Sequence, residues 1–278
     1  MNYRHIYHAG NFCDVFKHVV LTALTTSLLR KEAGFCFLDT HAGIGCYDLS
    51  AREAQRNPEF QHGIAKVRAA LHPPPLVQQY LECVAAVNEP KAKTLQYYPG
   101  SPAIVRQYLR SQDRMVLCEL HPADCETLKQ TFEGDRQTFV HCQDGYQGLK
   151  AFLPPKERRG LVLIDPPYEK PNEFMDVPQY LAQAVKRWDT GIYALWYPIK
   201  HIENLPPFYA ALSAEITKPM LSIELSIFPE NIEQSLNGNG LIIVNPPWQF
   251  EEQIQAVLPW LWQILSPEKQ GRHSVKAW

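Results

Sequence analysis

The most constraining feature of this 278-residue sequence is the alternation of short apolar runs with longer stretches in which apolar residues recur at helical spacing. Short runs of this kind are typical of buried strands, and the stretches between them predict crossover helices. The expected strands are 35–39, 115–120, 138–141, 160–165, 192–197, 221–228 and 240–245; the expected helices are 14–29, 102–110, 122–133, 145–152, 172–187 and 250–264. The pattern predicts an α/β fold of the Rossmann-like, doubly wound class, with a mainly parallel seven-stranded sheet that ends in a C-terminal antiparallel pair.

One interval is too long for this repeat. Glu119, at the end of the second expected strand, comes 80 residues after Asp39 at the end of the first, whereas a nucleotide-binding unit of this class separates its glycine turn from the second acid by about 20 residues. The excess contains three consecutive prolines between two expected helices, 62–71 and 76–88. We therefore expect a small helical insertion subdomain at 48–97, placed at the carboxyl edge of the sheet, and a main domain made of 1–47 and 98–278.

Composition excludes several classes of protein. No apolar run approaches the roughly 18 residues of a membrane span, and the polar, aromatic N-terminus lacks the apolar core of a signal peptide. The seven cysteines form no CxxC pair and lie partly in apolar runs, so we expect reduced, buried thiols in a cytoplasmic protein. The histidines near the N-terminus lack compact ligand spacing, so no metal site is expected.

Charge is unevenly distributed along the chain. The whole sequence carries 27 Lys and Arg against 29 Asp and Glu, which indicates nothing about a polyanionic partner. Between 201 and 260, however, seven Glu accompany a single Lys. A nucleic acid bound to this protein should therefore avoid the surface formed by that segment.

The most informative local motif is Asp165-Pro-Pro-Tyr168, directly after the apolar run 161–164. Two consecutive prolines fix the backbone and remove two amide donors, which leaves carbonyl acceptors on a rigid loop. The Asp165 carboxylate and the Pro166 carbonyl suit the two hydrogens of an exocyclic amine, and the Tyr168 ring suits stacking on a base. Asp165 can also accept the proton released by a transfer reaction. These features predict Asp165, Pro166 and Tyr168 as catalytic residues.

A second motif, Asn245-Pro-Pro-Trp248, has the same form with an amide in place of the acid. In a doubly wound sheet the fourth strand lies beside the first, at the switch point where ligands bind. Asp165 ends that fourth strand, whereas Asn245 ends the last strand, which we expect on an outer hairpin. We therefore interpret the motif at Asn245 as structural.

Polar residues also follow the first three expected strands. The segment 39–45 is a glycine turn with two of the three glycines of a dinucleotide fingerprint. Glu119 can accept from both hydroxyls of a ribose, and Asp144 can accept from an adenine amine. Ser101 begins an expected helix, a suitable place for a cofactor carboxylate. Together with the motif at Asp165, these residues match a bound adenosyl group that donates a methyl.

The sequence resembles the RlmJ family, bacterial methyltransferases that modify an adenine N6 of 23S ribosomal RNA. The resemblance runs nearly end to end and is carried by Tyr3-Arg-His5, His8-Ala-Gly-Asn11, Asp14-Val-Phe-Lys17-His18, Asp39-Thr-His-Ala-Gly43, Tyr98-Pro-Gly-Ser-Pro102, Glu119-Leu-His-Pro122, Asp165-Pro-Pro-Tyr168, Tyr193-Ala-Leu-Trp-Tyr-Pro198 and Asn245-Pro-Pro-Trp248.

The resemblance implies S-adenosylmethionine as the cofactor and 23S ribosomal RNA as the partner, with no metal, membrane or obligate protein partner. The residues that would contact the cofactor are His18, His41, Ser101, Glu119, Asp144, Gly145 and Asp165, and the residues that would contact the RNA or order the site are Tyr3, His5 and Lys17. From its charge alone, Lys17 also suits contact with a phosphate. The insertion would be the extra subdomain of the family.

The N-terminal arm, 1–11, has few aliphatic residues but several side chains that stack on bases or bind phosphates, among them Tyr3, Arg4 and His5. We expect it to be mobile in the free protein and to close over the target base; the alternative is a terminal segment packed against the sheet.

The expected activity is methylation of an adenine N6 in 23S ribosomal RNA, with the base flipped out of its stack. The same chemistry on DNA is the nearest alternative, although the insertion is small for a DNA-recognition domain. N5 methylation of a protein glutamine would favour Asn in place of Asp165. An alternative from another class of protein is an RNA-binding module that binds a nucleotide but catalyses no reaction. A dehydrogenase is the weakest of these alternatives, because the glycine fingerprint is incomplete.

Overall fold

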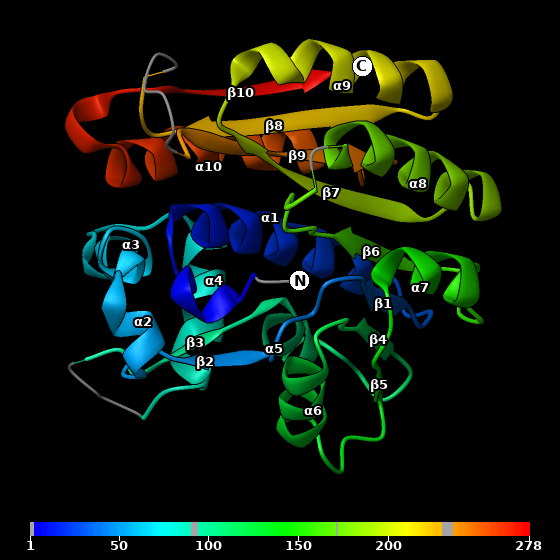
Figure 1. The fold of residues 1–278 in the computed structure, drawn as a ribbon, viewed down its shortest axis with the longest axis horizontal. Helices are drawn as coiled ribbons and strands as arrows, with labels where there is room; N and C mark the ends of the chain where they lie inside the picture. Colours follow the sequence, from blue (N-terminus) through cyan, green and yellow to red (C-terminus); the bar gives the residue numbers. More distant parts are fainter. Residues whose placement is uncertain (1–2, 90–93, 171, 230–235) are drawn as a thin grey trace.

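The computed structural model describes residues 3–89, 94–170, 172–229 and 236–278. Within these ranges, the main sheet has eight strands in the order β10-β8-β9-β7-β6-β1-β4-β5 (Figure 1). Their bounds are β1 (Cys36–Asp39), β4 (Arg114–Cys118), β5 (Thr138–His141), β6 (Gly160–Ile164), β7 (Ile192–Ile199), β8 (Met220–Ser226), β9 (Gly238–Val244) and β10 (Arg272–Ala277). The five strands from β7 to β5 pair in parallel, whereas the β7–β9, β9–β8 and β8–β10 pairs are antiparallel.

The predicted Rossmann-like α/β fold is confirmed, and each of the seven expected strands is present. The eighth strand, β10, was not predicted, because its sequence RHSVKA is mostly polar and lies at the edge of the sheet, half-buried or exposed. Because β10 pairs with β8, the antiparallel pair β8–β9 is not at the end of the sheet, where we expected it. Strand β9 lies inside the sheet, between β8 and β7, and is not part of an outer hairpin.

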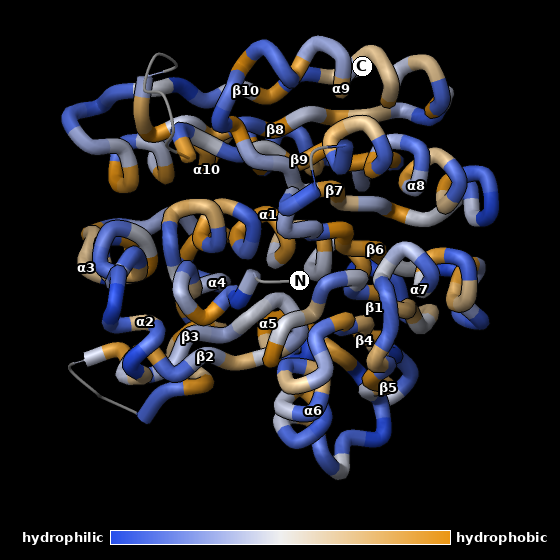
Figure 2. Tube along the Cα trace, viewed as in Figure 1, coloured by the Kyte–Doolittle hydropathy of each residue, from blue (hydrophilic) through white to orange (hydrophobic). Residues whose placement is uncertain are grey.

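Helices cover both faces of the sheet, as expected for a doubly wound fold. One hydrophobic core includes residues of α1 (Phe12–Leu29), α4 (Pro75–Ala86), α5 (Ser101–Arg106), α6 (Pro122–Thr131) and α10 (Phe250–Leu265); a second core, on the other face, includes residues of α7 (Gly145–Phe152), α8 (Glu173–Arg187) and α9 (Leu205–Glu215). Figure 2 shows hydrophobic residues concentrated along α1 and the central strands. Helix α9 was not predicted, and α5 ends earlier than expected.

Helix α1 determines much of the site. It is long and apolar enough to cross a membrane by length and composition, but 78% of it is buried inside the protein, where it packs against α4, α5 and α10. The Asn11 side chain caps its N-terminus by accepting from the backbone N–H of Asp14 at 3.0 Å. Its first turns carry the buried polar residues Asp14, Lys17 and His18. Buried polar side chains need partners, and all three of these residues line the cavity described below.

The segment between β1 and β4 forms a small helical unit, drawn in cyan and green-blue in Figure 1. The antiparallel strands β2 (Cys46–Asp48) and β3 (Tyr97–Pro99) bring its two ends together. Between them lie α2 (Arg52–Arg56), the short 3-10 helix η2 (Glu59–Gln61), α3 (Ile64–Ala69) and α4. The two helices expected at 62–71 and 76–88 are thus present as α3 and α4; β2, β3 and α2 were not predicted.

One prediction about the cysteines is wrong. Cys125 of α6 and Cys142 after β5 form a disulfide, with their Cα atoms 5.6 Å apart. The other cysteines, Cys13, Cys36, Cys46, Cys83 and Cys118, are free. The packing of α6 against β5 brings the bonded pair together, and no spacing motif in the sequence marks it.

Candidate functional site

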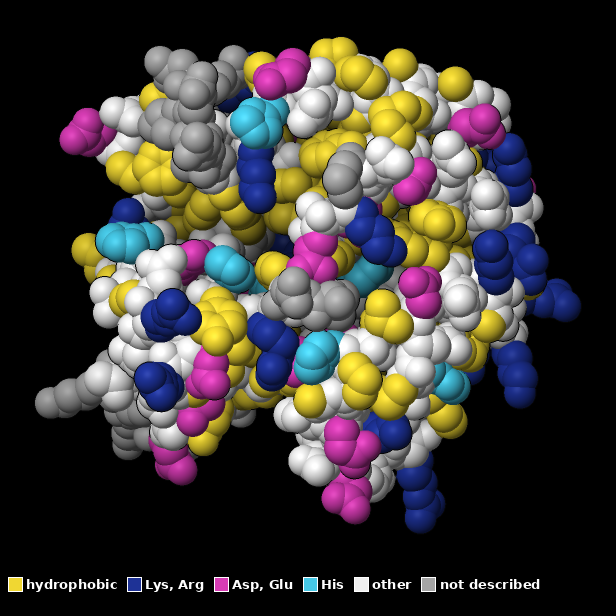
Figure 3. Space-filling model, in the orientation of Figure 1, with side chains coloured by type: hydrophobic (Ala, Val, Ile, Leu, Met, Phe, Trp, Pro, Cys, Tyr) yellow, Lys and Arg dark blue, Asp and Glu magenta, His cyan; other side chains and the backbone are white. Residues whose placement is uncertain are grey.

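The carboxyl ends of the five parallel strands line one large cavity of about 1130 Å³. The N-terminal arm, the first turns of α1 and the insertion complete its walls, and Figure 3 shows the hollow between the two halves of the molecule. Pockets that hold one small ligand typically measure about 300–1,000 Å³. The cavity therefore has room for a cofactor together with part of a second ligand.

Glu119 follows β4 and is buried at the cavity wall, with 6% of its surface exposed. One carboxylate oxygen accepts from the N–H of Gly43 at 2.9 Å and the other from the N–H of His121 at 2.7 Å. Burial raises the pKa of this carboxyl. Since a carboxylate has about four acceptor positions, both oxygens keep capacity for the hydroxyls of a ribose.

Asp144 and Gly145 lie at the start of α7, against the same cavity. The Asp144 side chain caps the helix by accepting from the backbone N–H of Tyr146 at 2.8 Å and of Gln147 at 3.1 Å. A Cβ atom on Gly145 would lie 2.0 Å from the carbonyl oxygen of Thr40. Only glycine therefore lets the loop after β5 pass this close to the loop after β1.

Two histidines line the cavity as neutral side chains. Burial lowers the pKa of His18 to about 3 and that of His41 to about 4. The Nδ1 atom of His18 lies 2.7 Å from the hydroxyl of Tyr98, and that of His41 lies 2.7 Å from the hydroxyl of Thr40. With Nδ1 engaged in this way, each neutral imidazole can offer its Nε2 to a bound ligand, as a donor or as an acceptor according to its tautomer.

Ser101 is also part of the cavity wall, but its hydroxyl already has a partner. Its Oγ donates to a carboxylate oxygen of Asp39 at 2.6 Å. Asp39 is fully buried, and burial raises its pKa to about 7. The predicted cofactor contact of Ser101 can thus come from its backbone N–H or from the lone pairs of Oγ, which remain free while the hydroxyl donates.

Asp165, directly after β6, forms an ion pair with Lys17 of α1. The Lys17 ammonium lies 2.5 Å from Asp165 and 3.0 Å from Asp14. Burial would lower the pKa of Lys17, but the carboxylates of Asp165 and Asp14 raise it well above its usual range. Lys17 is only 5% exposed. In this arrangement its charge neutralises the buried Asp14 carboxylate and the partly exposed Asp165 carboxylate, and it is not open to a phosphate in solvent.

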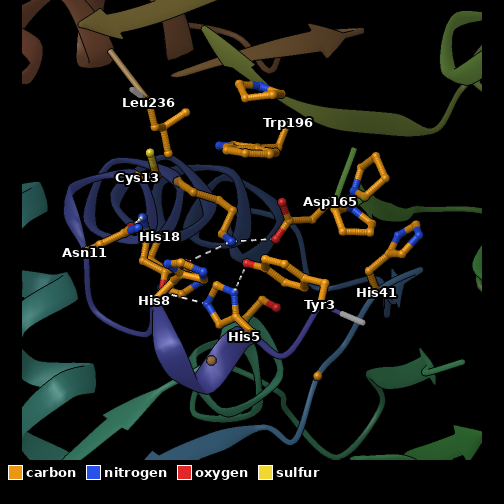
Figure 4. Close-up of a pocket in the computed structure, with 18 of the residues that line it drawn as sticks. Tyr3, His5, His8, Asn11, Cys13, His18, His41, Asp165, Trp196 and Leu236 are labelled. Atoms are coloured by element: carbon orange, nitrogen blue, oxygen red, sulfur yellow. Dashed lines mark hydrogen bonds and ion pairs between the residues drawn. The ribbon is translucent and has the colours of Figure 1, made fainter. Parts of the chain in front are cut away.

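Tyr168 does not line the cavity, unlike its two predicted catalytic neighbours. Asp165 and Pro166 line the cavity wall, whereas the Tyr168 hydroxyl donates to the carbonyl oxygen of Trp196 at 3.0 Å and its ring packs on Phe174. The Trp196 side chain lines the cavity instead. Figure 4 shows Trp196 on one side of Asp165, and Tyr3 on the other. In this conformation Trp196, and not Tyr168, offers a ring to a base.

The N-terminal arm is folded across the cavity. The backbone N–H of Tyr3 donates to Glu169 at 2.7 Å, and the Tyr3 hydroxyl lies 2.7 Å from Nδ1 of His5. His5 in turn contacts Asp14 at 2.8 Å. On the other side, Arg4 forms an ion pair with Asp124 of α6 at 2.8 Å. The predicted RNA-contacting residues Tyr3, His5 and Lys17 thus form one connected network with Asp14 and Asp165.

The second diproline motif lies at the opposite edge of the sheet. Because β9 is antiparallel to β7, Asn245 at its carboxyl end meets the amino end of β7. Its side-chain amide donates to the carbonyl oxygens of Asp189 at 3.0 Å and Gly191 at 2.7 Å. The expected outer hairpin was wrong, but these bonds give Asn245 a structural role away from the cavity.

Asp14 and Trp196 are the main cavity residues that we did not assign from the sequence. An acid in the first turn of a helix usually stabilises the helix, so nothing local distinguishes Asp14. Trp196 lies within the expected strand 192–197, where an aromatic residue is ordinary. Among the described residues, no group of three or more His, Cys, Asp or Glu side chains is arranged to hold a metal ion.

Comparison with known proteins gives consistent results. Residues 32–278 match the family model described as ribosomal RNA large subunit methyltransferase D, RlmJ. The chain is 42% identical over 278 residues to ribosomal RNA large subunit methyltransferase J of Escherichia coli strain K12, covering 100% of this chain and 98% of the relative. It is 40% identical over 276 residues to the protein of the same name from Haemophilus influenzae, covering 99% and 98%.

A solved structure agrees with these matches. The crystal structure of a protein from Legionella pneumophila has a TM-score of 0.87 to this chain and 37% sequence identity, and the match covers 98% of each chain. The similarity thus extends over the whole fold, including the insertion and the antiparallel strands. The chain belongs to the RlmJ family of ribosomal RNA large subunit methyltransferases.

Proposed function

We propose that this protein transfers a methyl group from S-adenosylmethionine to the exocyclic N6 of an adenine in 23S ribosomal RNA, in the cytoplasm. The observation that carries the proposal is the placement of Asp165 and Pro166 in the same cavity as Glu119 and Asp144. Acceptors for an amine and acceptors for an adenosyl group thus lie within one enclosure. The names of the 40–42% identical relatives support ribosomal RNA as the substrate.

The residues present fit S-adenosylmethionine. Glu119 would hold the ribose, Asp144 and Gly145 the adenine, and His18, His41 and Ser101 the methionine end. Asp39 holds the Ser101 hydroxyl from beneath the cavity wall, since it is fully buried and does not line the cavity itself. When bound, the cofactor supplies an electrophilic methyl group.

Asp165 and Pro166 would orient the target amine by accepting its two hydrogens, which turns the nitrogen lone pair toward the methyl donor. Lys17 holds the Asp165 carboxylate in place through the ion pair. Trp196 provides a ring on one side of Asp165, against which the flipped base can stack. Asp165 would then accept the proton that the amine loses.

The N-terminal arm would act as a lid. Its contacts to Glu169 and Asp124 hold it across part of the cavity, and their release would widen the entrance for cofactor or base. We also propose that the chain divides into a methyltransferase domain, 1–47 and 98–278, and an insertion subdomain, 48–97. The β2–β3 pair supports this division, since it joins the two ends of the insertion.

The deciding experiment is incubation with labelled S-adenosylmethionine and separate pools of ribosomal RNA, DNA and protein, followed by nucleoside analysis. We expect label in 23S ribosomal RNA, recovered as N6-methyladenosine. Label in DNA would instead indicate a DNA adenine methyltransferase, and label in protein glutamine would indicate a protein glutamine methyltransferase. Binding of RNA without transfer to any pool would indicate a non-catalytic module.

A further inference from the structure

A shallow pocket of about 270 Å³ lies between α7 and α8, next to the main cavity. Its walls include Lys150 from α7 and Lys186 and Arg187 from α8, and no acidic residue is among the described residues that line it. All three cationic side chains are exposed. Figure 3 shows Lys and Arg gathered on the right side of the view, where Figure 1 places these two helices. The pocket is therefore positively charged.

The three cationic side chains of the pocket make only weak or few contacts within the protein. Lys186 forms a surface ion pair with Glu215 at 2.8 Å, with both side chains about half exposed or more, and such pairs contribute little to stability. Arg187 donates one N–H to the carbonyl oxygen of Leu153, which leaves about four donors on its guanidinium. Among the described residues, no acidic side chain is paired with Lys150. An anion can thus bind at small cost to the existing structure.

Two tyrosines connect this pocket to the catalytic cavity. The rings of Tyr146 and Tyr180 stack with their centroids 4.1 Å apart and an interplanar angle of 13°. Tyr146 lines both the pocket and the cavity, and its ring contacts His41 edge-on. Lys170, exposed at the cavity wall, adds a cation on the same side. A chain-like ligand can therefore pass from the cavity across Tyr146 to the cations without leaving the surface.

Size and charge identify the occupant. The volume is below the roughly 300–1,000 Å³ of a pocket for an independent small ligand, so it suits one unit of a longer molecule that is held elsewhere. Exposed cations with adjacent aromatic rings are the combination that binds single-stranded nucleic acid. The lining residues all lie between 146 and 187, outside the acidic segment 201–260.

We propose that this α7–α8 pocket is a second RNA-binding site, which holds the sugar–phosphate backbone of a nucleotide near the target adenine while that adenine occupies the main cavity. This inference rests on the proposed RNA substrate and adds the path of the RNA to it. The pocket would contribute to RNA affinity and not to the chemical step, because none of its cations reaches the wall beside Asp165.

The test compares two lysines in equivalent positions. Lys150 and Lys129 are both exposed and both lie in the last turn of a helix, in α7 and α6 respectively, so Lys129→Ala controls for loss of charge at a helix end. We expect Lys150→Ala to weaken RNA binding about three- to tenfold and to reduce the slope of log affinity against log salt by about 0.7–0.9, the effect of one lost phosphate contact. Lys150→Glu should weaken binding further, and Lys150→Arg should restore it.

Three readouts separate the possible results. The kcat at saturating RNA and transfer to a free adenine mononucleotide should be unchanged in Lys150→Ala, because the catalytic cavity is intact. Tyr180→Ala should weaken RNA binding on the order of tenfold, by loss of stacking, whereas Tyr180→Phe should not. Equal salt slopes for Lys150→Ala, Lys129→Ala and the unmodified protein would overturn the inference while leaving the proposed function intact. Failure of the unmodified protein to methylate any RNA would overturn both.

Discussion

The Lys17 ammonium lies 2.5 Å from the Asp165 carboxylate, although the two residues are 148 positions apart in the sequence. The pair joins the first turns of α1 to the motif after β6, and Asp14 shares the same ammonium at 3.0 Å. If Asp165 is the catalytic carboxylate, as we propose, Lys17 would act as its positioning residue. Because its charge is enclosed within the protein, Lys17 differs from a surface lysine, whose charge is free to bind a phosphate.

Lys17→Met should abolish methyl transfer without changing the salt dependence of RNA binding. The substitution removes the counter-ion of the buried Asp14 and of the partly exposed Asp165, and it should also lower the free energy of unfolding by about 3–5 kcal/mol. Transfer, RNA affinity at several salt concentrations and urea unfolding would be measured below the melting temperature of the variant. A reduced salt slope would instead show that Lys17 contacts a phosphate.

Asp165→Ala should abolish transfer while cofactor affinity falls only a few-fold, because Glu119, Asp144 and the histidines remain. Asn245→Ala is the matched variant in the other diproline motif and should keep activity within a few-fold, since its amide bonds only the backbone before β7. Calorimetry and labelled transfer give the two quantities. An inactive Asn245→Ala protein with unchanged melting would contradict the structural role of that motif.

Trp196→Ala should cost on the order of 1–3 kcal/mol of base stacking, seen as reduced kcat/KM with unaltered cofactor affinity. Tyr168→Phe removes only the hydroxyl that donates to the Trp196 carbonyl and should reduce kcat/KM less. If Tyr168→Ala lowers transfer and Trp196→Ala does not, the Tyr168 ring must turn into the cavity when RNA binds, as its sequence motif first indicated.

His18→Gln should change how stability depends on pH. Burial lowers the pKa of His18 to about 3, whereas an unfolded histidine titrates near about 6.5. Between these values the unfolded chain binds the extra proton, so His18 makes the protein less stable as the pH falls from about 6.5 toward 3. Its removal should reduce this slope by about 1 kcal/mol per pH unit. Urea unfolding of both proteins across this range provides the measurement.

The comparison in that experiment must be between variant and unmodified protein. His41, whose pKa is lowered to about 4, contributes with the same sign, while Asp39, whose pKa is raised to about 7, contributes with the opposite sign. These two groups remain in both proteins and cancel in the difference. Identical slopes would mean that His18 is not buried as a neutral side chain.

Deletion of residues 1–8 should reduce transfer to RNA by at least about 100-fold and leave the melting temperature nearly unchanged. Residues 3–8 are exposed or half-buried, so the deletion removes little of the core, but it takes away Tyr3, His5 and the Arg4–Asp124 contact. Arg4→Ala alone should have a smaller effect in the same direction. Full activity of the deletion variant would exclude a lid, and an unfolded variant would favour the alternative of simple packing.

The sequence by itself determined the fold class and the edge at which the site forms. Its apolar runs alternate with helical stretches, and consecutive parallel strands point the same way, so residues after 39, 118, 141 and 164 meet at one edge of the sheet whatever their separation along the chain. For this reason Glu119, Asp144 and Asp165 could be placed together from their positions at strand ends. Strand β10 could not be predicted, because it pairs with the edge of β8, and that edge exists only once the sheet has folded.

Only the tertiary structure decided the partners of individual side chains. Two contacts show this: the Lys17–Asp165 ion pair and the Cys125–Cys142 disulfide join segments whose relative distance and rotation no local pattern specifies. For the same reason, the sequence could not indicate that Trp196, and not Tyr168, lines the cavity wall. Hydrophobic periodicity fixes which face of an element is buried. The close packing of one element on another then decides, to within a few ångströms, which polar atoms on those faces meet.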